Sequence, residues 1–215
     1  MFDASLYGYF RSSAAYRVRI ALNLKGIAPD LVFVHLRKDA QHDPAYMRLN
    51  PQALVPTLVH DGHAIGQSLA ILEYLEEMAP RPPLLPRASA DRARVRQIAL
   101  AVACEIHPLN NLRVLRYLEN RMKQNDRARI DWQRRWIAEG FDALERMLSR
   151  DPATGRFCHA DAPTLADVCL VPQLANARRV ELPLNAYPTL LRIEAEALAL
   201  PAFDAARPEK QPDAE

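Results

Sequence analysis

Along the first part of the chain, short apolar runs alternate with segments whose apolar residues recur at helical spacing. Residues 5–10 and 30–36 are rich in the apolar, branched and aromatic side chains of strands. Residues 15–26 and 68–77 instead place their apolar side chains on one helical face, and Gly26 provides a stop signal for the first of these helices. The alternation predicts an α/β domain at the start of the chain.

A β-hairpin and a short helical turn complete this part of the pattern. Residues 55–60 and 63–65 read as two strands, and the Asp61-Gly62 pair between them favours a tight turn because glycine accepts a positive φ. Residues 43–49 fit a short helical turn. These residues are therefore expected to form a β-hairpin.

The pattern changes near residue 80. A proline-rich stretch, residues 80–86, cannot continue the preceding helix, and every later periodic segment is helical. We therefore expect two domains, residues 1–82 and residues 88–215, the second of them all-helical. Its predicted helices are residues 92–122, 128–149 and 165–177, followed by one more helix after a turn near residue 187.

Two local features of the second domain have structural interpretations. Thr164 and Asp167 have the spacing of a capping box, so Thr164 is expected to cap a helix rather than to take part in chemistry. The polar tail, residues 208–215, is expected to be frayed.

Composition narrows the class of protein. With 215 residues, 49% of them hydrophobic, and a formal net charge of +2, the chain predicts a globular protein with a full core and no general attraction to nucleic acid. The sequence shows no secretory signal and no bilayer-spanning run, so no membrane association and a cytoplasmic location are expected. Three cysteines without CxxC spacing, Cys104, Cys158 and Cys169, are expected to be reduced and mostly packed. His60 and His63 lack a third ligand, so no metal is expected.

The junction after the first strand carries the strongest chemical signal. Arg11, Ser12 and Ser13 lie where a strand turns into a helix, and free N–H groups with the positive end of the helix dipole favour an anion there. A thiolate, a carboxylate or a phosphate would fit. On these residues alone an ordinary serine N-cap is the alternative.

Several motifs in a fixed order resemble one known family. The segments are YFRSSAAYRVRIALNLKG, NPQALVPTL, GQSLAILEYLEE, EIHPLNNLRVLRYL, TLADVCLVPQLANARR and QPD. Together they resemble the zeta-class glutathione transferases, in particular the bacterial maleylacetoacetate and maleylpyruvate isomerases. The resemblance implies an α/β plus all-α fold, with a thioredoxin-like N-terminal domain and a helical glutathione-transferase C-terminal domain. It also implies glutathione as cofactor and a homodimer.

The resemblance implies a set of glutathione contacts, each of which has a structural alternative. Val55-Pro56 would have a cis bond and offer the Val55 backbone to the cysteinyl part of glutathione, although an edge-strand proline explains the same residues. Ser68 would hold the γ-glutamyl carboxylate, although a helix cap also explains it. The full set is Gln41, Val55, Pro56, Gln67, Ser68, His107 and Asn111.

The implied chemistry needs a thiolate near neutral pH, whereas a free thiol has a pKa of about 8.5. Ser12 is expected to donate its hydroxyl to the sulfur, with Ser13 as the alternative donor. Many family members have a cysteine after the two serines, and this chain has Ala14 there. A mechanism that uses a protein thiol at this position is therefore excluded.

A diacid substrate calls for cationic donors. The resemblance assigns this role to four arginines, whereas Arg17 and Arg19 are expected to serve helix and interface packing. The four are Arg11, Arg113, Arg178 and Arg179.

The function expected from the resemblance is the conversion of maleylacetoacetate to fumarylacetoacetate in tyrosine and homogentisate breakdown. Glutathione would add to the double bond next to the carbonyl, allow rotation and then be expelled. The alternatives are a maleylpyruvate isomerase of gentisate breakdown, a broader transferase or dehalogenase, and a non-catalytic binding module with a glutathione-transferase-like fold.

Overall fold

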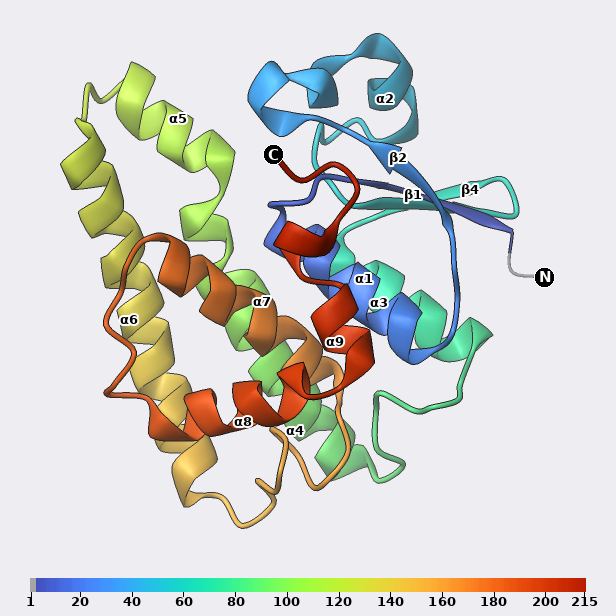
Figure 1. The fold of residues 1–215 in the computed structure, drawn as a ribbon, viewed down its shortest axis with the longest axis vertical. Helices are drawn as coiled ribbons and strands as arrows, with labels where there is room; N and C mark the ends of the chain where they lie inside the picture. Colours follow the sequence, from blue (N-terminus) through green and yellow to red (C-terminus); the bar gives the residue numbers. More distant parts are fainter. Residues whose placement is uncertain (1–2) are drawn as a thin grey trace. The chain divides into compact units, whose positions relative to one another are not determined.

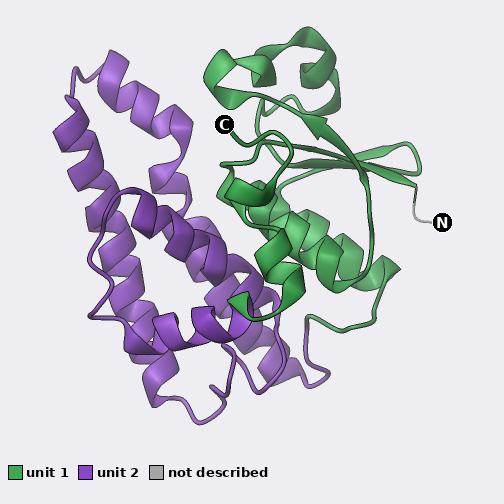
Figure 2. Cartoon of the chain, in the orientation of Figure 1, with its two compact units in different colours: residues 1–84, 198–215 green, residues 85–197 purple. Residues whose placement is uncertain are grey.

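The computed structural model describes residues 3–215 and contains two compact units (Figure 2). Unit 1 comprises the described residues up to Leu84 together with Leu198–Glu215, and unit 2 comprises Leu85–Ala197. The sequence-based boundaries of 1–82 and 88–215 differ from these units in the last residues, which cluster with the first unit. Within unit 1, Arg19 Nε donates to the Ala206 carbonyl at 3.1 Å.

Unit 1 is built on a mixed four-stranded sheet in the order β2-β1-β3-β4 (Figure 1). β1 (Ala4–Gly8) pairs in parallel with β2 (Asp30–Phe33), with Ser5 opposite Asp30. β3 (Thr57–His60) is antiparallel to β1 and to β4 (His63–Gly66), which follows it across the predicted Asp61-Gly62 turn. The α/β prediction is confirmed; β1, β2 and β3 are shorter than expected, and β4 is one residue longer.

The helices of unit 1 lie close to their predicted ranges. Ser12 caps α1, and buried Arg17 on that helix donates from Nη1 to Ser68 Oγ at 3.1 Å, which ties α1 to α3. The α-helices are α1 (Ser13–Leu24), α2 (Pro44–Leu49), α3 (Ser68–Met78) and α9 (Pro201–Ala205), and the 3₁₀ helices are η1 (Leu36–Lys38), η2 (Ala40–His42) and η5 (Pro208–Lys210).

The chain leaving α3 is fastened by a buried lysine. The Lys25 side chain is fully enclosed, and its Nζ donates to Glu76 Oε2 at 2.8 Å and to the carbonyls of Ala79 and Pro82 at 2.6 and 3.1 Å. Glu76 in turn accepts from the Leu84 amide at 3.0 Å. The start of the proline-rich stretch is therefore held against the end of α1.

The regular elements of unit 2 are all helices, joined by turns and loops (Figure 1). The predicted helix over 92–122 is interrupted, because Pro108 has no amide to donate and Asn111 starts a new helix as its N-cap. The Thr164–Asp167 capping box is confirmed. The elements are α4 (Ser89–Leu100), the π-helix η3 (Ala101–Ile106), the 3₁₀ helix η4 (Pro108–Asn110), α5 (Leu112–Asn120), α6 (Asp126–Arg150), α7 (Leu165–Arg179) and α8 (Pro188–Leu198).

The predicted fraying of the tail is wrong. Asp213 Oδ2 accepts from the Phe10 amide at 3.0 Å, and Glu215 Oε1 lies 2.5 Å from His35 Nε2. These long-range contacts hold the polar tail on unit 1. Among residues 3–215, no helix is both long and apolar enough to cross a membrane.

Candidate functional site

The turn between β1 and α1 presents a serine hydroxyl at the start of a helix. The Ser12 amide donates to the Tyr9 carbonyl at 3.0 Å, which closes a tight turn over these four residues. Ser12 Oγ accepts from the Ala15 amide at 3.2 Å, as an N-cap does. Capping uses a lone pair of the oxygen, so the hydroxyl proton can be donated to a second group.

The neighbours of Ser12 differ in accessibility. Arg11 is exposed and Ser12 half-buried, whereas Ser13 begins α1 with only 6% of its surface exposed. Ala14 is buried and has no reactive group. Ser12 is therefore the more accessible of the two serines to a ligand at the helix N-terminus.

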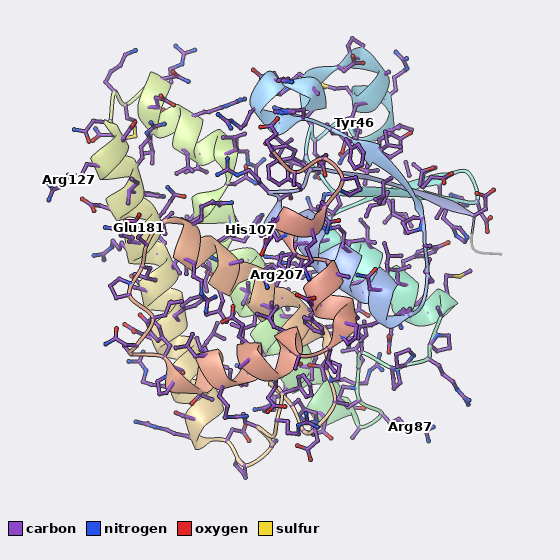
Figure 3. The ribbon with its side chains drawn as sticks, viewed as in Figure 1. Tyr46, Arg87, His107, Arg127, Glu181 and Arg207 are labelled. Atoms are coloured by element: carbon purple, nitrogen blue, oxygen red, sulfur yellow. The ribbon has the colours of Figure 1, made fainter. Side chains whose placement is uncertain are left out.

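An apolar cluster connects this turn to the segment before β3. Tyr9 and Phe10 of the turn pack with Val34, Tyr46 and Val55 in one buried cluster. The Tyr9 and Phe10 rings meet edge to face, with their centroids 4.8 Å apart. Tyr46, labelled in Figure 3, is the buried residue of α2. The turn and Val55 are thus two parts of one packed region.

Val55 and Pro56 are joined by a cis peptide bond, as the resemblance implied. The pairing of β3 with β1 begins at Thr57, so both residues lie outside the strand ladder. The Leu54 carbonyl is fixed by the Tyr46 hydroxyl and by Asn50 Nδ2, the latter at 2.9 Å. Sequence reasoning missed this support, which only the folded contacts reveal.

At the start of α3 the structure corrects one expectation. Ser68 was predicted as the N-cap, but Gln67 occupies that position and Ser68 is the first helical residue. The buried Arg17 guanidinium needs acceptors, and Ser68 Oγ provides one. Gln67 has φ 64°, makes no side-chain cap, and donates from Nε2 to Gln52 Oε1 at 2.7 Å. The first turn of α3 therefore begins without a side-chain cap.

Gln41 offers an unused acceptor. It lies in η2, with 5% of its surface exposed, and its Nε2 donates to Asp39 Oδ1 at 3.1 Å. Its Oε1 is buried and has no hydrogen-bond partner among residues 3–215. A buried amide oxygen without a partner is costly, so a ligand N–H at this position would be stabilising.

The remaining predicted contacts belong to unit 2. His107 is half-buried at the end of the π-helix and is labelled in Figure 3; its amide donates to the Val102 carbonyl at 2.9 Å. Asn111 Oδ1 accepts from the Arg113 amide at 3.1 Å and so caps α5, while the Arg113 side chain is exposed.

The two arginines at the end of α7 differ. Arg178 donates from both terminal nitrogens to the carboxylate of Glu194 on α8, whose side chain is 6% exposed. Arg179 is exposed as well. The pair with Glu194 commits Arg178 to a structural contact.

The cysteines and the side chains that could bind a metal ion were the other candidates for a reactive site among residues 3–215. Burial, reinforced by Asp167, raises the pKa of the Cys158 thiol well above its usual value, and Cys169 is buried as well. Cys104 is exposed, so two of the three cysteines are packed, in agreement with the expectation that most of them are. No group of three or more His, Cys, Asp or Glu side chains within residues 3–215 is arranged to hold a metal ion.

Two family models match the chain. They are the "Glutathione S-transferase, N-terminal domain" over residues 11–78 and the "Glutathione S-transferase, C-terminal domain" over residues 124–205. The first covers Ser12 and α1, Val55-Pro56 and the start of α3.

Full-length relatives extend this similarity. A "Probable maleylacetoacetate isomerase" of Vibrio cholerae is 47% identical over 216 residues, covering 100% of both chains. A solved maleyl pyruvate isomerase, described as a zeta-class bacterial glutathione S-transferase in a holo structure, has a TM-score of 0.96 at 44% identity, over 98% of this chain and 100% of that one. The maleylacetoacetate isomerase of Methylobacterium extorquens AM1, solved with bound malonate and GSH, has a TM-score of 0.96 at 44% identity, over 98% and 99% of the chains.

Proposed function

Because this chain belongs to the zeta class of the glutathione S-transferase family, we propose that it is a glutathione-dependent isomerase that converts maleylacetoacetate to fumarylacetoacetate. The observation that carries the proposal is the Ser12 hydroxyl at the N-terminus of α1, whose proton can be donated while its oxygen caps the helix. The full-length 47% relative named for this reaction supports the choice of substrate. Its place would be homogentisate breakdown.

The donor set of unit 1 fits glutathione. When bound, glutathione supplies a thiolate that acts as a recycled nucleophile for the isomerisation. Ser12 donates its hydroxyl proton towards the sulfur, and the dipole of α1 adds positive potential, so the ionised form is favoured at neutral pH. Ser13, being buried, is the alternative donor. The role of Ser12 is therefore to hold a sulfur anion, without a protein nucleophile.

Other groups of unit 1 hold the tripeptide. The Val55 backbone lies outside the ladder and can pair with the cysteinyl backbone, with Pro56 keeping the segment in place. The first N–H groups of α3, together with Gln67 and the Ser68 hydroxyl, receive the γ-glutamyl carboxylate. Gln41 supplies its unused amide oxygen.

We assign the remaining predicted residues to the substrate side of the reaction and to further glutathione contacts. His107 and Asn111 are proposed to contact glutathione. Arg11, Arg113 and Arg179 are proposed to hold the carboxylates and the developing negative charge of the diacid. Arg178 is the least favoured of the four arginines for this role, because it is already paired with Glu194.

The decisive experiment measures turnover with glutathione present and absent. We expect glutathione-dependent isomerisation of maleylacetoacetate with a larger kcat/KM than for maleylpyruvate. Maleylpyruvate belongs in the comparison because a solved relative with a TM-score of 0.96 is named for it. A larger kcat/KM for maleylpyruvate would identify maleylpyruvate as the preferred substrate. If the protein neither turns over these substrates nor binds glutathione, only the non-catalytic binding module remains.

We also propose that the protein is a cytoplasmic homodimer, as the family resemblance implies. Light scattering of the purified protein at micromolar concentration should give twice the 24.3 kDa chain mass. A monomeric mass under these conditions would refute the dimer, and fractionation of the source cells tests the location.

A further inference from the structure

The backbone of Phe10 is held by two charged side chains, Arg19 of α1 and Asp213 near the end of the chain. Its amide donates to Asp213 Oδ2 at 3.0 Å, and its carbonyl accepts from Arg19 Nη2 at 3.1 Å. Phe10 is the second residue of the turn that begins at Tyr9 and ends at Ser12. The end of the chain thus contacts the turn that presents the proposed thiolate donor.

The two charged side chains are themselves anchored. Arg19 is 8% exposed and also donates from Nε to the Ala206 carbonyl at 3.1 Å. Burial lowers the pKa of Arg19 to about 10, opposed by the nearby Asp213 carboxylate and by Tyr16. Opposite charges therefore contact the amide and the carbonyl of the same residue, Phe10, and the Asp213 carboxylate favours the charged form of Arg19.

The tail that carries Asp213 is fixed as well. Gln211 Nε2 donates to the carbonyls of Ala205 and Arg207 at 2.9 and 2.8 Å, and the Ala214 amide donates to the Gln211 carbonyl. Figure 1 shows this segment, in red, within the same unit as α1. Asp213 consequently reaches Phe10 from a backbone that is held in place.

From these contacts we infer that Asp213 and Arg19 are positioning residues, which hold the Phe10 backbone so that the Ser12 hydroxyl is aimed at the bound thiol. The inference rests on the proposed glutathione chemistry. Ser12 follows Phe10 by two residues and its amide closes the same turn, so a shift of the Phe10 backbone moves Ser12. A displacement of about 1 Å at a reacting group can lower a rate by about a hundredfold.

The test compares Asp213→Ala with Asp213→Asn, because asparagine keeps an oxygen that can accept from the Phe10 amide. Glu209→Ala is the matched control, since it removes an exposed carboxylate of the same tail that pairs with Arg207. Three quantities are measured: hydrogen exchange of the Phe10 amide in the ligand-free protein, the pKa of the bound glutathione thiol from thiolate absorbance, and kcat with KM for glutathione.

For Asp213→Ala we expect faster exchange of the Phe10 amide, a rise of about one unit in the thiol pKa, and a kcat about tenfold lower. The KM for glutathione should change less than threefold, because Val55, Gln67 and Ser68 are untouched. Asp213→Asn should recover most of the thiol pKa and kcat, and Glu209→Ala should match the wild type. Thermal unfolding of each variant identifies any general loss of folding.

Two results would overturn the inference. One is a wild-type thiol pKa and kcat in Asp213→Ala, and the other is equal losses in the alanine and asparagine variants. A wild-type protein that neither binds glutathione nor turns over would instead refute the proposed function, while the Phe10 exchange would still report on the turn.

Discussion

Replacement of Ser12 by alanine separates two roles of one hydroxyl. The oxygen accepts from the Ala15 amide and so caps α1, while the proton is proposed to be donated to the glutathione sulfur. Loss of a serine cap costs about 1 kcal/mol of stability. Loss of a hydrogen bond to an anion costs about 1.5–3 kcal/mol, which corresponds to about one to two pKa units of the thiol.

These magnitudes predict distinct outcomes in different measurements. Ser12→Ala should lower the free energy of unfolding by about 1 kcal/mol, raise the pKa of the bound thiol by about one to two units, and lower kcat by about a hundredfold. The dissociation constant for glutathione should change much less, because Val55, Gln67 and Ser68 hold the rest of the tripeptide. Thiolate absorbance, steady-state kinetics, calorimetric binding and urea unfolding give the four values.

Two further variants of Ser12 separate donation of the hydroxyl proton from capping of the helix. Ser12→Gly keeps most of the capping energy because glycine is a good N-cap, yet it has no hydroxyl to donate. Ser12→Thr keeps both functions. We therefore expect glycine to behave as alanine does in kcat and thiol pKa while remaining closer to the wild type in stability. A wild-type thiol pKa in the glycine variant would refute the role of Ser12 and transfer it to Ser13 or to backbone N–H groups.

Three more variants test other parts of the structure. Lys25→Met should lower the free energy of unfolding by about 3–5 kcal/mol, because it leaves the Glu76 carboxylate without its buried cation; urea unfolding should show partial recovery when Glu76→Gln is added, and no recovery would contradict the pairing. Asp167→Asn should cost about 2–3 kcal/mol in the same assay, since the carboxylate accepts three hydrogen bonds in full burial, and a change below 1 kcal/mol would argue against this. Arg179→Ala should raise the KM for diacids more than the KM for uncharged electrophiles, with Arg178→Ala as the comparison. Equal effects on both substrate types would refute the proposed contact between Arg179 and a substrate carboxylate.

Local sequence patterns determined most of the fold of unit 1. The aromatic and branched residues of 5–10 and the helical spacing of 15–26 predicted β1 and α1 to within a few residues, because these preferences act between near neighbours. Ser68 shows the limit of such reasoning. Serine is favoured at an N-cap, but Ser68 is the first residue of α3 and accepts from buried Arg17, which lies on another helix.

The tail and the helix break show the same limit. Nothing in the local composition of residues 208–215 indicates that Asp213 meets Phe10, because that contact spans most of the chain. Pro108 gave a local signal for a break, but the long apolar periodicity around it favoured one continuous helix. In the candidate site, Ser12, Gln41 and Val55-Pro56 came from motifs, whereas the support of Leu54 by Tyr46 and Asn50 needed the folded contacts.

Non-glycine residues with a left-handed backbone occur beside the proposed glutathione contacts of unit 1. Asp39 has φ 59° two positions before Gln41, Ala53 has φ 53° two positions before Val55, and Gln67 itself has φ 64°. Glycine adopts these angles more easily and would relieve backbone strain at each position, although at Asp39 it would also remove the carboxylate that accepts from Gln41. At Gln67 that exchange would delete the amide proposed to receive the cofactor. Thermostability screens that score folding alone should therefore select variants here that have lost affinity for glutathione.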